Sequence, residues 1–162
     1  MGHINGRNHM ADVTEEITGA LNNLCALWTH MDQPQILDLW DRQEPNPYLL
    51  AQEKAGPIIG WNNLETYYRQ ANERLVRCSM RVWDINAKLL SDDLAVALYQ
   101  MHWNGEIKGS DHLFGIDSRV TIIFRNRGPG WLICHYVEAP TAPMLHLQKY
   151  YGAMVDPDFI ND

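Results

Sequence analysis

Residues 119–140, RVTIIFRNRGPGWLICHYVEAP, decide the fold. Two apolar segments, VTIIF and WLICHYV, alternate with period two on either side of the turn-rich NRGPG, and this pattern predicts a β-hairpin. Residues of both parities are apolar, so neither face of the hairpin is purely polar. We therefore expect both faces to be covered, one by a helical layer or a cavity and the other by a partner subunit.

The rest of the chain divides into a helical first half and a strand-rich second half. Apolar residues recur at helical spacing over residues 11–31, 35–43 and 61–75, which predicts three helices. One short strand is expected between the prolines of residues 44–57, and long strands are predicted at 76–90, 94–106, 112–126 and 130–138. The spacing of Met144, Leu147 and Tyr150 predicts a further short C-terminal helix. Helices followed by an antiparallel meander indicate an α+β fold.

Length and composition predict one domain with a sizeable core. The chain has 162 residues, of which 46% are hydrophobic. Residues 1–9, MGHINGRNH, precede a second methionine and have no apolar period, so we interpret them as a disordered, vector-derived tail and residues 10–162 as the single domain. The three cysteines are an odd number at spacings that match no zinc pattern, which favours buried free thiols.

Charge and hydropathy exclude two classes of partner. The formal net charge of -7 would repel phosphate backbones, and the basic residues are scattered, so we expect no nucleic-acid partner. No long apolar run or signal segment is present, so we expect no membrane association and a cytoplasmic location.

Turns at Asp92-Asp93 and near Gly109 predict a register for the long strands. In this register one face of the sheet is apolar at one end and polar at the other, as in a concave sheet whose open end forms a pocket. A slip of one residue at either turn would move every one of these side chains to the opposite face. The residues predicted at the polar end are Arg81, Trp83, Gln100, His102, Asn104, Ser118 and Glu138.

The order of elements, the glycine before the third helix (Gly60) and residues 119–140 resemble the SnoaL-like branch of the nuclear-transport-factor-two-like superfamily. In that branch, strands often end in Arg-x-Thr, a turn and then Gly-Trp-x-Ile-x-His. The resemblance covers residues 11–143 and is specific for fold rather than chemistry. It implies a cystatin-like cone, in which a strongly curved antiparallel sheet wraps three N-terminal helices, encloses a cavity and forms a homodimer. Known members include ketosteroid isomerase, scytalone dehydratase and non-catalytic association modules.

The resemblance also suggests catalytic residues. Glu53 lies within two positions of the general base of ketosteroid isomerase, which makes it the leading base candidate. Tyr48 loosely matches a tyrosine of scytalone dehydratase, and His102 is placed compatibly with one of its two histidines. The oxyanion hole of the isomerase has no clear match, which argues against a steroid isomerase, and the second histidine of the family's His-x-His is Val137 here.

In the predicted register Arg81, His102 and Glu138 converge, and mutually perturbed charged groups in a cleft are functional candidates. The alternative for Arg81 is a structural ion-pair network at the sheet rim, and the alternative for Glu53 and Lys54 is a pair of solvated charges. Most of the six tryptophans are expected to pack in the core or in a dimer interface. The full prediction assigns Glu53, His102, Arg81 and Tyr48 to catalysis, and Trp28, Trp61, Trp83, Gln100, Tyr136, Glu138 and Lys54 to substrate binding.

The sequence contains no metal-ligand spacing, phosphate loop, nucleophile elbow or dinucleotide fingerprint. We therefore expect no metal and no cofactor, and if the chain is an enzyme, a lyase, isomerase or dehydratase that uses general acid–base chemistry. The expected ligand is a hydrophobic, aromatic small molecule, for example a lignin-derived aromatic dimer. The alternative is a non-catalytic ligand-binding or assembly module, and a cavity without titratable groups would favour it.

Overall fold

The computed structural model describes residues 5–141, with side chains described from Val13 onwards. It has the predicted α+β order of elements, and each of the four long strands lies within two residues of its predicted bounds. The elements are α1 (Asn5–Thr29), α2 (Gln33–Asp38), β1 (Tyr48–Leu50), β2 (Ile58–Ile59), α3 (Trp61–Arg74), β3 (Leu75–Ser91), β4 (Leu94–Ile107), β5 (Leu113–Asn126) and β6 (Trp131–Pro140). Helix α1 begins six residues earlier than the apolar spacing predicts. The predicted C-terminal helix lies outside the described residues.

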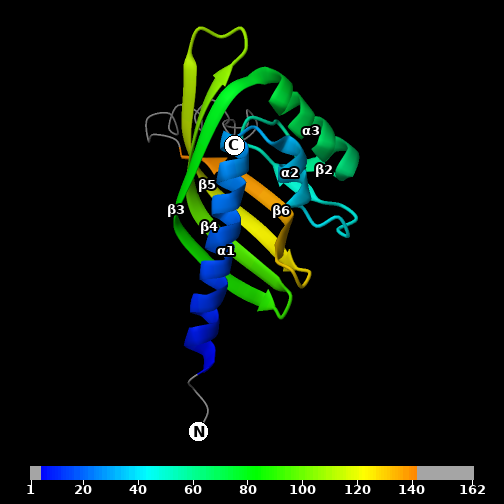
Figure 1. The fold of residues 1–162 in the computed structure, drawn as a ribbon, viewed down its shortest axis with the longest axis vertical. Helices are drawn as coiled ribbons and strands as arrows, with labels where there is room; N and C mark the ends of the chain where they lie inside the picture. Colours follow the sequence, from blue (N-terminus) through cyan, green and yellow to red (C-terminus); the bar gives the residue numbers. More distant parts are fainter. Residues whose placement is uncertain (1–4, 142–162) are drawn as a thin grey trace, which may run out of the picture.

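The strands form one curved sheet in the order β2-β1-β6-β5-β4-β3. Strands β3 to β6 are the predicted antiparallel meander, whereas the parallel pairing of β1 with β6 was not predicted. The sheet curves around α1, and α2 and α3 lie beside one end of it (Figure 1). Short β1 therefore lies next to β6 and carries the following loop toward the concave face.

The core lies between α1 and the concave face of the sheet. One stripe of α1 is buried there and packs mainly against β3, where Thr14 Oγ1 donates to the Ala87 carbonyl at 3.4 Å. The buried alanines Ala87, Ala95 and Ala97 belong to the same apolar core. The buried residues of this stripe are Val13, Ile17, Leu21, Leu24 and Trp28.

Two irregularities in β3 make the register differ from the predicted one. Leu89 pairs with Ala95 and Ser91 with Leu94, so Leu90 is an extra residue beside the predicted turn. This bulge shifts β4 by one position, so its odd-numbered residues, such as Tyr99 and Met101, face the core.

The second irregularity lies between Trp83 and Asn86, where Asp84 has a positive φ of 53°. An extra residue at this point reverses the side-chain alternation along β3. The prediction is therefore right for Ala87 and Leu89, which face inward, but wrong for Arg81 and Trp83, which face outward.

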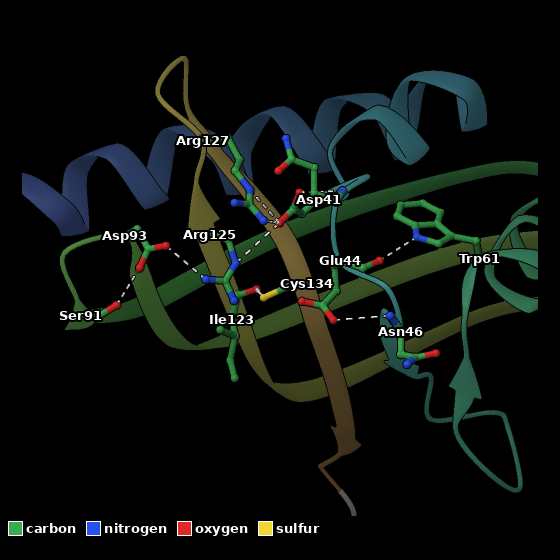
Figure 2. Close-up of polar contacts among 11 residues, drawn as sticks. Asp41, Glu44, Asn46, Trp61, Ser91, Asp93, Ile123, Arg125, Arg127 and Cys134 are labelled. Atoms are coloured by element: carbon green, nitrogen blue, oxygen red, sulfur yellow. Dashed lines mark hydrogen bonds and ion pairs between the residues drawn. The ribbon is translucent and has the colours of Figure 1, made fainter.

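A buried carboxylate joins the end of α2 to two turns of the sheet. Asp41 is 1% exposed and accepts hydrogen bonds from Arg127 Nη2 at 2.8 Å and from Arg127 Nε at 3.1 Å. Figure 2 shows Arg125 between Asp41 and Asp93, to which its Nη1 donates at 3.2 Å. Burial alone would raise the pKa of Asp41, but the hydrogen bonds from Arg127 and from the backbone of Gln43 outweigh burial, so the pKa is lowered.

Replacing this carboxylate should destabilise the fold in a pH-dependent way. Because the arginines are only partly buried, Asp41→Asn is expected to cost about 2 kcal/mol at neutral pH, less than the loss of one partner of a fully buried ion pair. The folded pKa lies below the ordinary value of 3.8, so the contribution is complete above that pH and is lost as the pH falls through the folded pKa. Urea denaturation at neutral and acidic pH measures both effects.

The control is Asp38→Asn, because Asp38 is an exposed carboxylate three residues earlier on α2. Equal loss of stability in the two variants, or a loss for Asp41→Asn that does not shrink in acid, would contradict a structural role for the Asp41 ion pairs.

Candidate functional site

A cavity of about 450 Å³ opens between α3, the end of α1 and the concave face of β3 to β6. Its volume is in the range typical of small-molecule sites. A shallower groove of about 340 Å³ lies on the other side of Lys54, Tyr67 and Gln70, which line both spaces. These three side chains thus separate the cavity from the groove.

Aromatic and aliphatic side chains form most of the cavity wall. Trp28 contributes from α1, Trp103 from β4 and Phe114 from β5, together with Met80 and Met101. The Trp103 indole lies over Gly105, where an added Cβ would overlap the ring. Flat walls of this kind favour a flat, apolar ligand.

The largely buried carboxyl group in this wall is that of Glu138. Its Oε1 accepts a hydrogen bond from the Tyr136 hydroxyl at 2.7 Å, and its Oε2 accepts one from the Gln52 backbone N–H at 3.4 Å. Burial raises the pKa of Glu138 above the ordinary value of 4.5, and the nearby negative charge of Glu53 adds to this, despite the two hydrogen bonds. Glu138 therefore binds its proton more tightly than a solvated glutamate.

The loop after β1 brings three consecutive polar residues to the cavity. The buried Ser118 hydroxyl donates to Gln52 Oε1 at 2.6 Å, which fixes the Gln52 side chain. The Tyr67 hydroxyl donates to Glu53 Oε1 at 3.1 Å, and Lys54 Nζ lies 5.4 Å from the centre of the Tyr67 ring. Burial, reinforced by the charges of Glu53 and Glu138, raises the pKa of Tyr67 well above 10.0, so this residue is a neutral hydrogen-bond donor.

The structure brings some of the predicted site residues together. Trp28, Glu53, Lys54 and Glu138 all line the cavity, and Tyr136 lies beneath Glu138. Trp61 lies elsewhere, at the edge of the core, where its Nε1 donates to the Glu44 carbonyl at 2.8 Å (Figure 2). Tyr48 is 43% exposed and packs against the His135 ring outside the cavity.

The other predicted site residues lie on the convex face of the sheet. His102 Nδ1 is 2.6 Å from Asp117 Oδ1, and Gln100 is on the same strand face. Arg81 lies over the ring of Trp83, which is 37% exposed. The predicted convergence of Arg81 and His102 with Glu138 is therefore absent, because the bulges in β3 turn these two residues outward. The expected homodimer through this face stays a prediction.

Several cavity residues were missed from the sequence. Tyr67, Gln70 and Arg74 recur at helical spacing along α3, beside its apolar stripe. This row of polar side chains next to a buried stripe was the signal in the sequence that could have identified them. Trp103 was missed because the predicted register turned the odd-numbered residues of β4 outward.

Among the side chains of residues 13–141, no group of three or more His, Cys, Asp or Glu is arranged to hold a metal ion. Within residues 5–141, no helix is both long enough and apolar enough to cross a membrane.

The contact between Gly105 and Trp103 predicts a substitution that changes the shape of the cavity wall. In Gly105→Ala the new methyl group would overlap the Trp103 indole, which lines the cavity, so the indole would have to move and the cavity wall would change. We expect weaker binding of aromatic ligands, measured by calorimetry, with an unchanged far-ultraviolet circular dichroism spectrum. Gly130→Ala is the control, because a Cβ there meets no atom within 4 Å. Equal binding by both variants would contradict the predicted movement of Trp103.

The raised pKa of Glu138 predicts that this carboxyl group lowers stability at neutral pH. Below the ordinary pKa of 4.5 Glu138 carries its proton in both the folded and the unfolded state, so no free energy is spent on burying a charged carboxylate. As the pH rises toward the folded pKa, the unfolded state loses its proton first and stability falls. Glu138→Gln should therefore have a higher Tm than the wild type at neutral pH, and this gain should disappear in acid.

Thermal denaturation across this pH range measures the difference. Glu15→Gln on the exposed face of α1 controls for the loss of one negative charge. A Glu138→Gln variant that is less stable than the wild type at neutral pH, or that gains stability equally at all pH values, would contradict the effect of burial.

Comparisons with solved structures support the fold. A nuclear transport factor 2-like superfamily protein from Salmonella enterica is 17% identical, with a TM-score of 0.69 over 83% of this chain and 94% of that one. Two proteins from Novosphingobium aromaticivorans are also similar. A proposed scytalone dehydratase is 8% identical, with a TM-score of 0.73 over 82% of this chain and 86% of that one. A proposed aromatic ring hydroxylase is 14% identical, with a TM-score of 0.71 over 80% and 90%.

No curated protein matches the chain. The family model of the SnoaL-like domain, however, matches residues 17–143, which include α2, α3, all six strands and most of α1. The curved, mostly antiparallel sheet with helices on its concave face agrees with this match. The chain therefore belongs to the SnoaL-like domain family.

Proposed function

We propose that the chain is a lyase, isomerase or dehydratase that acts by general acid–base chemistry, without a cofactor, on a hydrophobic aromatic small molecule. A lignin-derived aromatic dimer is one example of such a substrate. The proposed scytalone dehydratase and aromatic ring hydroxylase among the similar structures are consistent with aromatic substrates. The observation that carries the proposal is that the largely buried carboxyl group of Glu138 lines the aromatic cavity.

Glu138 has the properties of a general acid–base group. It lies in an aromatic wall, and its pKa is raised mainly by burial. A carboxyl group whose pKa moves toward neutral pH is a stronger base when ionised and can still return its proton, so it can serve in both halves of a proton transfer. The Tyr136 hydroxyl, 2.7 Å from Oε1, fixes the orientation of the carboxyl group.

Proton transfer in this cavity would proceed as follows. The Glu138 carboxylate removes a proton from a substrate carbon next to an activating group, and the electron pair of the C–H bond moves into that group. The Lys54 ammonium group lines the same cavity and can stabilise the resulting negative charge. Glu138 then returns the proton to another carbon, which completes an isomerisation, or to a departing hydroxyl group, which completes a dehydration.

Glu53, the leading base candidate from the sequence, fits a different role better. Its side chain is exposed, and its Oε1 accepts the hydrogen bond from Tyr67. It therefore fixes the Tyr67 side chain in the cavity wall rather than removing a proton itself. The two carboxyl groups have different environments, one buried and one solvated, which is how enzymes separate two carboxylate roles.

The alternative is a non-catalytic binding or assembly module with the same fold. An apolar cavity without titratable groups would have favoured this alternative. The cavity instead contains Glu53, Glu138, Lys54, Tyr67 and Arg74. These groups support an enzyme, although Arg81 and His102, which the sequence analysis expected among them, lie on the convex face.

The base can be tested before the natural substrate is known. The probe is 5-nitrobenzisoxazole, an aromatic molecule whose ring opens when one carbon-bound proton is removed, with release of a coloured phenolate. We expect Glu138→Gln to lower kcat/KM by about 100-fold, the usual contribution of a general base, and Glu53→Gln to lower it much less. In the wild type the rate should fall as the pH drops below the raised pKa of Glu138, which lies above 4.5.

Glu15→Gln again controls for charge, and near-wild-type turnover by Glu138→Gln would dismiss Glu138 as the base. A larger loss in Glu53→Gln than in Glu138→Gln would return the base to Glu53. A screen of aromatic dimers, polyketides and epoxides with the same variants then identifies the natural class of substrate.

A further inference from the structure

Two cationic side chains line the cavity without a carboxylate partner. Lys54 reaches it from the loop after β1, and Arg74 is the last residue of α3. Among residues 13–141 neither forms an ion pair, whereas Arg77 and Arg127 each pair with a carboxylate. Within residues 13–141, the Lys54 ammonium group lies over the face of the Tyr67 ring, which holds it beside the cavity without neutralising it.

Among residues 13–141, the carboxyl groups of the cavity do not form ion pairs with these cations. Glu138 accepts hydrogen bonds from the Tyr136 hydroxyl and the Gln52 backbone N–H, and Glu53 accepts one from the Tyr67 hydroxyl. The net charge of the chain is -7, so two unpaired cations in one cavity run against the overall composition. Apolar walls around such a charge weaken its screening by water and strengthen its attraction for an anion.

Position within the cavity indicates where the anionic group would lie. Arg74 is exposed and Lys54 is partly buried, so both charges are near solvent, while Glu138 is at the more buried side. An anion at the mouth keeps part of its hydration, which limits the cost of desolvation. The aromatic walls formed by Trp28, Trp103 and Phe114 surround the remaining space.

We infer that the ligand is an ionised aromatic carboxylic acid, with its carboxylate held by Lys54 and Arg74 and its uncharged ring system lying between the aromatic walls toward Glu138. This inference rests on the proposed function only in placing the ligand in the same cavity. It names a class of substrate that neither the family nor the similar structures specify, and it makes Lys54 and Arg74 specificity determinants.

The test compares three probes of the same shape by isothermal titration calorimetry at neutral pH and low salt. They are 2-naphthoate, the neutral naphthalene-2-carboxamide and the cationic 2-naphthylmethylammonium ion. We expect 2-naphthoate to bind about fivefold more tightly than the amide, the size of a partly exposed ion pair, and the cation to bind most weakly. The preference should shrink at high salt. The double variant Lys54→Gln/Arg74→Gln should bind 2-naphthoate and the amide equally.

Lys88→Gln is the matched control, because Lys88 is an exposed lysine on β3 that does not line the cavity. It should keep the preference of the wild type. Binding of the amide as tightly as 2-naphthoate, an equal loss of preference in Lys88→Gln, or a Kd for 2-naphthoate weaker than about 1 mM in the wild type would overturn the inference.

Glu138→Gln separates this inference from the proposed function. The variant keeps Lys54, Arg74 and the aromatic walls, so its preference for 2-naphthoate over the amide should persist whether or not Glu138 is the base. A preference for the carboxylate together with undiminished proton abstraction in Glu138→Gln would sink the proposed function alone. Base catalysis by Glu138 without the carboxylate preference would sink the ligand inference alone.

Discussion

The extra residues in β3 and β6 are the constraint on which the rest of the structure depends. Asp84 and Ile85 lie opposite the single residue Tyr99, and Cys134 is an extra residue between the partners of Ile123 and Phe124. Each such bulge increases the local twist and bends its strand. The bends let the sheet curve around α1 (Figure 1), and they also decide which side chains of β3 face the cavity. Curvature and cavity lining therefore have one physical cause.

The same geometry determines how the carboxyl group of Glu138 is buried in an apolar wall. β6 lies between β1 and β5 in the sheet, so its inward side chains are surrounded on both sides. A carboxyl group at this position loses hydration and recovers part of it through Tyr136 and the Gln52 backbone. A buried carboxyl group lowers the stability of the fold. A residue that lowers stability points to a functional role more strongly than a residue whose presence is explained by packing.

Local periodicity in the sequence was sufficient to predict the elements and the fold class, because helices and strands follow from the spacing of neighbouring residues. It also placed Glu138 on the face that lines the cavity, although the bulge at Cys134 lies between Glu138 and the turn of the hairpin. The faces of β3 and β4 could not be predicted in the same way, because one extra residue reverses a face and leaves the apolar pattern almost unchanged. A signal did exist in Trp83-Asp84-Ile85-Asn86, since Asp and Asn are depleted in strands and tolerate a positive φ.

The place of the loop after β1 in the cavity depends on a contact that no local pattern encodes. The loop reaches the cavity because β1 pairs in parallel with β6, and this pairing joins segments more than 80 residues apart. Once there, its three polar residues are held to different degrees. Gln52 is fixed through both its backbone and its side chain, Glu53 by one hydrogen bond, and Lys54 only by the face of a ring.

This gradation matches the parts that the three residues would play. A fixed donor is needed to orient Glu138, an oriented acceptor is sufficient for Tyr67, and a charge that must meet ligands of different length is best left free to move on its four-carbon stem. The three residues thus become less tightly held from Gln52 to Lys54. The same order leads from the buried Glu138 to the solvent-exposed mouth of the cavity.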